Sequence, residues 1–580
     1  MPKQERASWH WIWPLSLAVL VLLTLGIRYA EPVRDGDLWW QMAYGRYLIE
    51  NRTLIPDHTA FTWTPTRSDA LYCAWMSEIA LYLLYRVGDL PLLFAFRYLC
   101  LLIFVLAVWF QAYRLGVANH PMTWLICLLG VLMSQSAAFI KPEIFSYVLM
   151  TMTVFVWWHI KTSGERAWRA CYLFPVLMVI WVNSHGGFIF GAVLLFLVGL
   201  GEVLNALFAP KEALRSRVRR HLFIALFLSG VAIFLTPYGW RYPAYLIRVF
   251  SGDSLESRRI IKAYLTVFDP RTSHFHYASY LYLSGLILLG LMWHNLRRRR
   301  LDWVLVLTNL VFAFIYTRFL RSTYYWAPIF SLSAVHLLAH RASWFWPKRR
   351  AVALGLGSVI TLVSILLGAR ASSDAICRPY EPRWFGFGIS YQNPVEEAEF
   401  VRNHLSAYRL GNDYDSGGYL LWALWPDMKV MIDPREFPFR EWLDSYLAFH
   451  RGHEVSRFVE EFPCDVWCVR YESHALITWF LRSPEWNIAF YGPSAVLFTR
   501  GSVPLMGGVT WVGTGIGEIK NLRQALIVFS FACAIRDWDS ANRVLASMKS
   551  RFRCPGDQSR IQGASDWLAL RAESARGPVQ

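Results

Sequence analysis

Long apolar runs separated by short polar connections fill the first 370 residues of the chain. The first run, Trp11 to Ala30, follows a short basic start and lacks a small-residue cleavage pattern before Glu31, so we expect an anchor helix and not a cleaved signal peptide. Further runs lie at about 91–113, 121–139, 142–160, 170–183, 187–208, 222–236, 278–294, 301–316, 323–339 and 351–369. A spanning helix needs about 20 residues. The pattern therefore predicts a polytopic α-helical membrane protein with about eleven spans, of which 170–183 and 222–236 are short enough to be tilted or re-entrant.

The composition agrees with a membrane protein and not with a soluble enzyme. Of the 580 residues, 55% are hydrophobic and 17% are charged. The net charge of +17 comes largely from basic clusters in alternate connections, so nucleic acid is not expected as a partner. These clusters lie at Arg114, 161–169, 211–220, 297–300 and 341–350. Because basic residues in short loops stay in the cytoplasm, the N-terminus is expected inside and the long loops 31–90 and 237–277 outside.

The pattern changes at about residue 371, which separates a transmembrane domain, 1–370, from an outward-facing part. Mixed segments predict an extracytoplasmic α/β domain over 371–505 with a partly parallel sheet, then a glycine-rich linker and a terminal helical pair within 515–580. One expected strand enters a turn at Gly417-Gly418, a second covers Lys429 to Ile432, and a third lies in "CDVWCVR". Two more form a hairpin around Gly492-Pro493. One short helix is expected to start at Tyr419. Further helices are expected at about 441–450, 453–462, 473–482, 519–535 and 538–552.

Two carboxylates stand at a membrane boundary in the first outer loop. Asp35 and Asp37 precede Trp39 and Trp40, although Asp is among the costliest residues to bring near lipid. In one interpretation, the tryptophans form an interfacial belt and the carboxylates keep the loop in water. In the other, the loop folds back beneath a surface helix at 76–88 and presents a general base to a lipid-linked substrate. Both interpretations stay open at this point.

This outer loop resembles that of a known enzyme superfamily. The segments "DLWWQMAYGRYLIEN", "IPDHTAFTWT" and "WMSEIALYLLY" are similar to the GT-C superfamily of polyprenyl-phosphate-dependent integral membrane glycosyltransferases. That superfamily includes the oligosaccharyltransferase catalytic subunit, protein mannosyltransferases and the aminoarabinose transferase of lipid A. An acidic residue shortly after the first membrane helix is essential in them. The resemblance implies Asp37 for that role and Asp35 as second choice, with His58 and Glu78 of the same segments in supporting roles.

Three later segments extend the resemblance. They are "KPEIFSY" with Lys141 and Glu143, "WVNSHGGF" with His185, and "GGYLLWALWPDMKVMIDPRE" with Asp433 and Arg435. The chain departs from the best-defined members, because it lacks the doubled acidic pair of the aminoarabinose transferases at Asp37 and the tryptophan-tryptophan-aspartate-tyrosine-glycine motif of the oligosaccharyltransferases. Neither acceptor is therefore implied.

A departing phosphate needs positive charge, and three basic residues near the outer face are candidates. Lys141 could meet a lipid phosphate, with Glu143 on a sugar hydroxyl or a divalent metal; the alternative is a surface ion pair. Arg318 and Arg321 share a short outer turn and are either phosphate ligands or interfacial anchors. The nine cysteines have no metal-type spacing, and pairing of Cys464 with Cys468 cannot be decided from sequence. A metal cofactor is left open.

We therefore expect a GT-C-like glycosyltransferase. It would move a sugar from a polyprenyl-phosphate carrier to an unidentified acceptor at the outer face of a bacterial cytoplasmic membrane, with inversion and with Asp37 as general base. The rival functions are a transporter or lipid flippase, which would place charged groups near mid-membrane, and a non-catalytic assembly factor that docks through its outer domain.

Overall fold

The computed structural model describes residues 12–67, 70–251, 265–269, 275–297, 301–340, 350–377, 384–435, 437–503, 510–553 and 555–575. These residues divide into two compact units. The membrane unit consists of the described residues of Met1–Tyr29, Arg52–Ile55 and Leu71–Asp374. The sheet unit consists of those of Ala30–Asn51, Pro56–Ala70 and Ala375–Gln580. The segment that follows the first apolar run therefore belongs mainly to the same compact unit as the C-terminal part of the chain.

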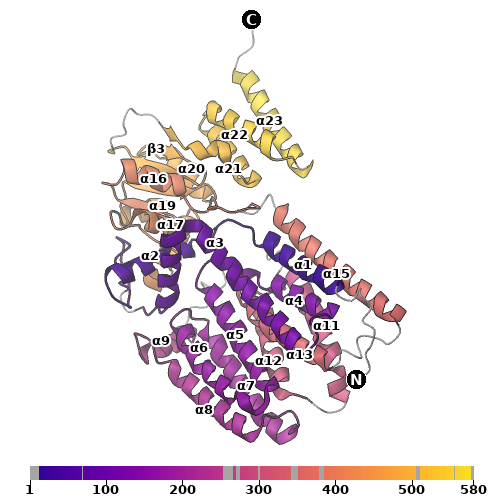
Figure 1. Cartoon of the computed structure of the whole chain (residues 1–580). Coiled ribbons are helices and arrows are strands. Elements are labelled where there is room, and N and C mark those ends of the chain that lie inside the picture. Colours follow the sequence, from indigo (N-terminus) through magenta and orange to yellow (C-terminus); the bar gives the residue numbers. More distant parts are fainter. Residues whose placement is uncertain are drawn as a thin grey trace. The chain divides into compact units, whose positions relative to one another are not determined.

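The membrane unit is built from helices, and every apolar run recognised in the sequence lies on one (Figure 1). They are α1 (Ile12–Arg28), α3 (Trp75–Arg114), α4 (Pro121–Met133), α5 (Glu143–Thr162), α6 (Leu173–Val182), α7 (Phe188–Phe208), α8 (Ser216–Ala232), α9 (Arg241–Ser251), α11 (Phe275–Arg297), α12 (Trp303–Arg318), α13 (Thr323–Ala339) and α15 (Arg350–Ile376). Four of the described helices are long and apolar enough to cross a bilayer: α3, α5, α7 and the Leu354–Ile376 part of α15. A polytopic helical fold is confirmed, and eleven spans stay a prediction.

The expected surface helix at 76–88 and the expected span at 91–113 form one element, α3, with a break between them. Gly88 and Asp89 leave the helical region, and Asp89 has a φ of 51°. The Asp89 carboxylate accepts a hydrogen bond from the Leu90 backbone N–H at 2.8 Å, and Pro91 follows, so a new helix start is built inside the run.

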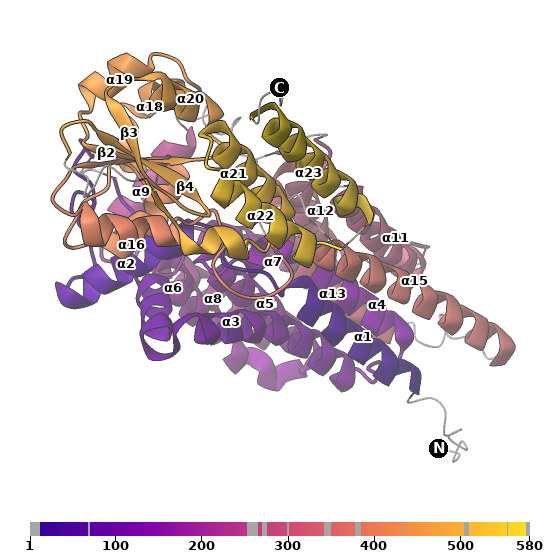
Figure 2. The same ribbon diagram turned by 90° about the horizontal axis from the view of Figure 1, so that it is seen from above.

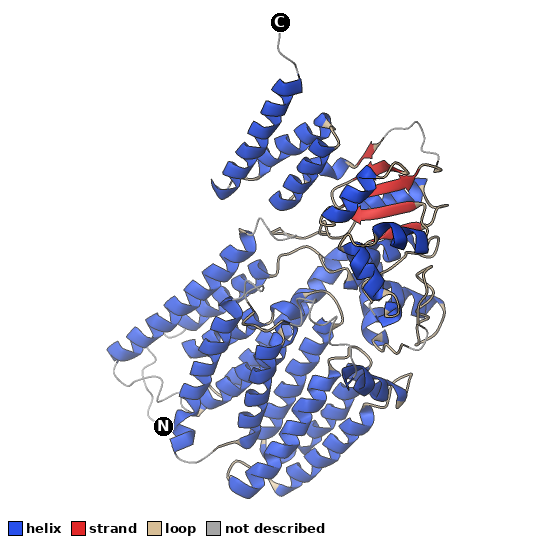
Figure 3. Cartoon of the chain, turned by 180° about the vertical axis from the view of Figure 1, so that it is seen from behind, coloured by secondary structure: helices blue, strands red, loops and turns tan. Residues whose placement is uncertain are grey.

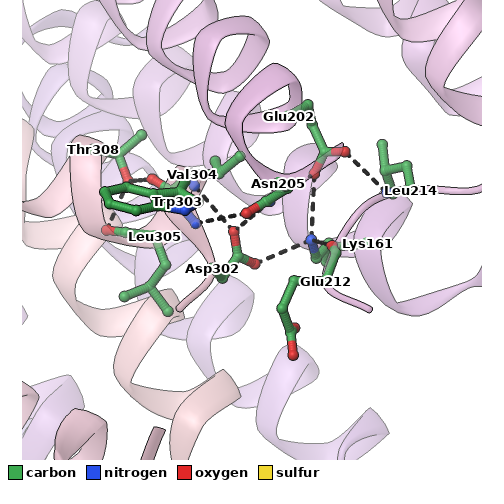
Figure 4. A network of polar contacts seen from close by, with 10 residues as sticks. All are labelled: Lys161, Glu202, Asn205, Glu212, Leu214, Asp302, Trp303, Val304, Leu305 and Thr308. Carbon is green, nitrogen blue, oxygen red and sulfur yellow. Dashed lines mark hydrogen bonds and ion pairs between the residues drawn. The ribbon is translucent and has the colours of Figure 1, made fainter. Parts of the chain in front are cut away.

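A buried ion-pair network joins the end of α5 to α7 and to the residue before α12. Because α5 rises about 1.5 Å per residue, Glu143 and Lys161 lie near opposite ends of a rod about 27 Å apart. The Lys161 ammonium contacts Glu202 of α7 at 3.3 Å and Asp302 before α12 at 3.1 Å (Figure 4). Both carboxylates are nearly inaccessible, so they compensate the buried ammonium charge.

The basic clusters that predicted orientation are only partly within the described residues. Arg298–Arg300 and 341–349 lie outside them, as do 252–264 and 270–274 of the loop 237–277. The inside and outside assignments stay predictions.

The sheet unit holds a five-stranded mixed sheet of order β1-β2-β4-β3-β5 (Figure 3). The strands are β1 (Leu410–Asn412), β2 (Val466–Arg470), β3 (Trp486–Tyr491), β4 (Ala495–Arg500) and β5 (Trp511–Val512). Strand β1 pairs in parallel with β2, and β3 with β5, whereas β4 runs antiparallel to both of its neighbours. The predicted buried strand in "CDVWCVR" and the predicted hairpin around Gly492-Pro493 are confirmed.

Helices surround this sheet, with α18–α20 together on one side and α16 on the other (Figure 2). The helices of the unit are α2 (Asp37–Glu50), α16 (Val395–His404), α17 (Tyr414–Leu424), α18 (Leu443–His450), α19 (Val455–Glu461), α20 (His474–Arg482), α21 (Leu522–Ala534), α22 (Trp538–Arg551) and α23 (Pro555–Ala575). Residues of β2, β4, α21 and α22 share one apolar core. Cys464 and Cys468 are both buried and free, so no disulfide joins them.

Two local predictions for this unit were wrong. Gly417 and Gly418 lie inside α17, which begins at Tyr414 and not at Tyr419. Among the described residues, the segment from Lys429 to Ile432 forms a single isolated bridge, between Thr62 and Val430, and no named strand. Its partner, Thr62, lies far away in the sequence, so the local pattern could not indicate how short the pairing is.

Candidate functional site

The two acidic candidates that follow the first apolar run stand at the N-terminus of α2. Asp37 is the first residue of the helix, and both carboxylates are half-buried. Asp35 Oδ1 accepts a hydrogen bond from the Asp37 backbone N–H at 3.0 Å, and Asp37 Oδ1 accepts one from Trp40 Nε1 at 3.0 Å. Asp35 therefore caps the first turn, while Trp40 orients the Asp37 carboxylate. A carboxylate in the first turn also interacts favourably with the positive end of the helix.

Close packing against α17 fixes this turn. A Cβ atom at Gly418 would collide with the Gly36 carbonyl oxygen, and one at Gly417 would collide with the Ile432 carbonyl oxygen. Trp39 meets the Tyr419 ring edge-on, with ring centroids 4.8 Å apart. Gly418 is therefore needed for the close approach of α17 to the turn that carries Asp37, and Gly417 for its approach to the backbone at Ile432.

A buried network of one ion pair and several hydrogen bonds joins Tyr44 of α2 to the segment after α17. Asp433 and Arg435 form a bidentate ion pair, Nε to Oδ1 at 2.6 Å and Nη2 to Oδ2 at 2.7 Å, and neither side chain is exposed. Arg435 Nη1 donates to the Tyr44 hydroxyl of α2 at 2.6 Å and to the His58 carbonyl at 3.0 Å. The three sequence candidates His58, Asp433 and Arg435 thus lie together, and Tyr44 joins them.

His58 is held neutral in this network. Its Nδ1 lies 2.6 Å from the Tyr44 hydroxyl, and its Nε2 lies 3.0 Å from the Ala70 carbonyl oxygen, to which it donates. Desolvation, assisted by the neighbouring Arg435 charge, lowers the pKa of His58 to about 4. A neutral imidazole that uses both ring nitrogens inside the protein supports the site and leaves catalysis to other groups.

The membrane unit carries a second cluster, formed where α5 begins and where α12 and α13 connect. Glu143, the first residue of α5, forms a close ion pair with Arg321 and lies 3.6 Å from the Lys141 ammonium. The Glu143 side chain is 5% exposed, whereas that of Arg321 is 39% exposed. Both cations therefore contact the same carboxylate, and both are of the kind that can meet a phosphate.

His185 completes the cluster from the turn between α6 and α7. Its Nδ1 lies 2.7 Å from the Ser146 hydroxyl and accepts the Gly187 backbone N–H at 3.1 Å. Desolvation lowers the pKa of His185 to about 4, against the opposing charge of Glu143. A Cβ at Gly187 would collide with the Tyr325 hydroxyl, so the second glycine of "WVNSHGGF" provides room for the cluster.

Asn183 of the same segment has a structural role. Its Oδ1 accepts the Trp75 Nε1 at 2.7 Å, and its amide nitrogen donates to the Val179 and Leu235 carbonyl oxygens at 2.8 Å. The start of α3 is thereby tied to the turn that carries His185.

Two other candidates of the membrane unit stand apart from these contacts. Arg318 is exposed, and its guanidinium lies over the Phe314 ring at 5.0 Å. Glu78 is buried in the first turn of α3, and its Oε1 has no hydrogen-bond partner within the described part of the chain.

The structure therefore gathers the candidates into two groups, one in each unit. Asp35, Asp37, His58, Asp433 and Arg435 belong to the sheet unit. Lys141, Glu143, His185 and Arg321 belong to the membrane unit. Sequence reasoning missed Tyr44, Ser146 and Tyr325, because an isolated hydroxyl in an apolar helix carries no pattern of its own. Among the described residues, no group of three or more His, Cys, Asp or Glu side chains is arranged to hold a metal ion.

The fold is similar to those of solved membrane glycosyltransferases. The archaeal oligosaccharyltransferase AglB from Archaeoglobus fulgidus, in complex with an inhibitory peptide and a dolichol-phosphate, matches with a TM-score of 0.53 at 12% identity, over 82% of this chain and 72% of its own. An Archaeoglobus fulgidus oligosaccharyltransferase in complex with Zn and sulfate matches with a TM-score of 0.51 at 11% identity. The match covers 84% of this chain and 74% of the oligosaccharyltransferase chain. ArnT from Cupriavidus metallidurans in the apo state gives a TM-score of 0.48 at 10% identity, over 84% and 97%.

No protein-family model matches the sequence, and no curated protein is significantly similar to it. The likeness is one of fold, and it agrees with the resemblance that the segments after the first apolar run indicated. The chain has a fold similar to that of these oligosaccharyltransferases.

Proposed function

We propose that this GT-C-fold chain transfers a sugar from a polyprenyl-phosphate carrier to an acceptor at the outer face of a bacterial cytoplasmic membrane. The observation that carries the proposal is the cluster of Lys141 and Arg321 around the single carboxylate of Glu143. In a GT-C fold, two cations at the end of a helix bundle suit the phosphate of a lipid-linked donor. The AglB structure with the similar fold contains a dolichol-phosphate, which supports this class of ligand.

Each group then has a chemical role. The Asp37 carboxylate accepts the proton of the acceptor hydroxyl as its oxygen attacks the anomeric carbon. The bond to the phosphate oxygen breaks on the opposite face of the sugar, so configuration inverts. Lys141 and Arg321 balance the negative charge that develops on the departing polyprenyl phosphate. Glu143 holds both cations in place, and Asp35 and Trp40 orient the loop that carries Asp37.

Binding of the carrier tests the proposal directly. The purified full chain should gain thermal stability from undecaprenyl phosphate and not from undecaprenol, since only the former carries the phosphate. The matched control is Arg114→Ala, which removes an arginine at the other end of the helices, where it contacts His159 and Ser163. Equal stabilisation by the two lipids, or by undecaprenyl phosphate in wild type and Arg321→Ala, would contradict a phosphate site at this cluster.

The identity of the donor can be read from cells. When the gene is deleted, lipid extracts should accumulate a polyprenyl-phosphate sugar, and mass spectrometry of that lipid would name the sugar. Unchanged lipid-linked sugars, in a strain where the intact gene is expressed, would argue against this function.

The orientation gives a separate prediction. A reporter fused after residue 300 should be cytoplasmic, because Arg297 to Arg300 form a basic cluster, and one fused after residue 400 should not be. Paired fusions of alkaline phosphatase and green fluorescent protein would measure this. Cytoplasmic activity of both fusions would place the Asp37 carboxylate on the wrong side for an outward-facing enzyme.

Arg321 should act through charge and through its paired donors. Arg321→Lys keeps the charge and loses the planar fork, so turnover should fall less than in Arg321→Ala. Steady-state transfer from the lipid donor in proteoliposomes measures the difference. Wild-type turnover in both variants would assign Arg321 to interfacial anchoring.

A further inference from the structure

A cavity of about 260 Å³ lies in the membrane unit, at the end of α5 opposite to Glu143. Its polar lining comes from the end of α5, the connection before α8 and the end of α13. These lining residues are Lys161, Lys211, Glu212, Arg215, His336 and His340. The volume exceeds that of one water molecule, about 30 Å³, several times over. No role in sugar transfer is required of this end of the unit.

The contacts of Lys161 hold part of the cavity lining in place before any ligand binds. Lys161 is 8% exposed and is bound by Glu202, Asp302 and the Glu212 carbonyl oxygen. In Figure 4 the Glu212 carboxylate points away from Lys161, so only its backbone joins the network. Because its charge is already compensated, Lys161 serves to hold the Glu212 backbone in place. The Leu214 backbone N–H donates to Glu202 at 2.9 Å and fixes the same connection.

His336 places an unsatisfied polar atom in this lining. Its Nδ1 is buried and has no hydrogen-bond partner among the residues that the structure describes. The ring is held by stacking on Trp158, with centroids 4.2 Å apart, and by an edge contact with His340 at 4.7 Å. A buried ring nitrogen without a hydrogen-bond partner lowers stability unless a ligand or a water molecule forms that bond. In the tautomer that carries the proton on Nδ1, this nitrogen can donate to an anion in the cavity.

The rim adds exposed cations. Lys211 and His340 are exposed. Arg215 pairs with Glu165 at 3.0 Å, but both side chains are more than half exposed, so that pair is weak and can exchange its partner. Lys211 and Arg215 thus add two exposed cations to the lining beside the Glu212 side chain, and the two imidazoles add further possible donors.

We propose that this cavity binds a phosphate-type anion, supplied either by the headgroup of an anionic phospholipid or by free phosphate. Basic pockets between membrane helices are typical binding places for such headgroups. Lys211 and Arg215 supply charge at the rim, and His336 Nδ1–H donates to a phosphate oxygen inside. The ligand would brace the connections after α5 and before α8. The proposal does not depend on sugar transfer and concerns the opposite end of α5.

The test uses the purified full chain in maltoside micelles and follows its melting temperature. One arm adds dioleoylphosphatidylglycerol, with dioleoylphosphatidylcholine as the neutral comparison. The other arm adds sodium phosphate, with sodium chloride at equal ionic strength. A specific ligand at a hundredfold excess over its Kd should raise Tm by about 2 °C or more. Lys211→Ala with His340→Ala should raise the Kd at least about tenfold.

Two further variants make the result decisive. His336→Phe keeps the ring on Trp158 and removes the donor, so it should also weaken binding. Arg220→Ala removes an exposed cation of α8 that does not line the cavity, and it should bind like wild type. A shift with phosphatidylglycerol alone identifies a lipid headgroup, and one with phosphate alone identifies a soluble ligand. No shift with either probe, or equal shifts in all variants, overturns the proposal.

Discussion

Asp37→Asn is expected to lower the rate of sugar transfer by about 10²–10⁴-fold, which is the usual contribution of a general base. Asparagine has nearly the same size, and its side-chain oxygen can still accept the hydrogen bond from Trp40 Nε1. The start of α2 should therefore keep its conformation while proton acceptance is lost. Asp35→Asn should lose distinctly less activity, because Asp35 serves the helix cap, where a neutral oxygen also accepts the Asp37 N–H.

The measurement is transfer from the lipid donor in proteoliposomes, with donor binding and melting temperature followed in parallel. Asp57→Asn is the matched control, since Asp57 lies in the same loop and caps Thr59 through Oδ1 at 2.8 Å. It should transfer at the wild-type rate. If Asp37→Asn transfers normally and Asp35→Asn fails, Asp35 is the base. If both transfer normally, the loop is structural and the glycosyltransferase proposal loses its main mechanistic support.

The sequence predicted those elements whose signals are local. The apolar runs fall on helices because each pattern is contained in one segment, and the hairpin around Gly492-Pro493 forms because both of its strands flank one turn. Lys141 and Glu143 are neighbours in sequence, so their association was also predictable. Arg321, 178 residues further on, could be proposed only from its charge in a short connection. Its pairing with Glu143 depends on the packing of the helices.

Contacts between distant segments were out of reach for the same reason. The pairing of Thr62 with Val430 and the bond from Arg435 to Tyr44 each join residues more than 350 positions apart. The glycine pair at 417–418 shows how a local rule misleads. Adjacent glycines usually indicate a turn, but here they lie within a helix because Gly418 packs directly on the Gly36 backbone. Only the tertiary partner reveals that requirement.

Arg435→Met is expected to lower the free energy of unfolding of the sheet unit by about 3–5 kcal/mol, because it leaves the fully buried Asp433 carboxylate without its counter-ion. The same substitution removes the donor to Tyr44, so α2 should lose part of its attachment. Pulse proteolysis of the purified full chain across a urea series measures the loss. The double variant Asp433→Leu with Arg435→Met should recover much of it, since no buried charge remains.

Arg46→Met provides the matched control for this last prediction. Arg46 also lies on α2, where it pairs with Glu50 at 2.8 Å and lies over the Trp425 ring at 4.9 Å. Both members of the ion pair are partly exposed, so the change should cost about 1–2 kcal/mol, less than Arg435→Met. If Arg435→Met is no more destabilising than Arg46→Met, the buried pair does not hold the unit together. If the double variant is as unstable as Arg435→Met alone, the lost stability belongs to the Tyr44 and His58 contacts. The unpaired Asp433 charge would then contribute little.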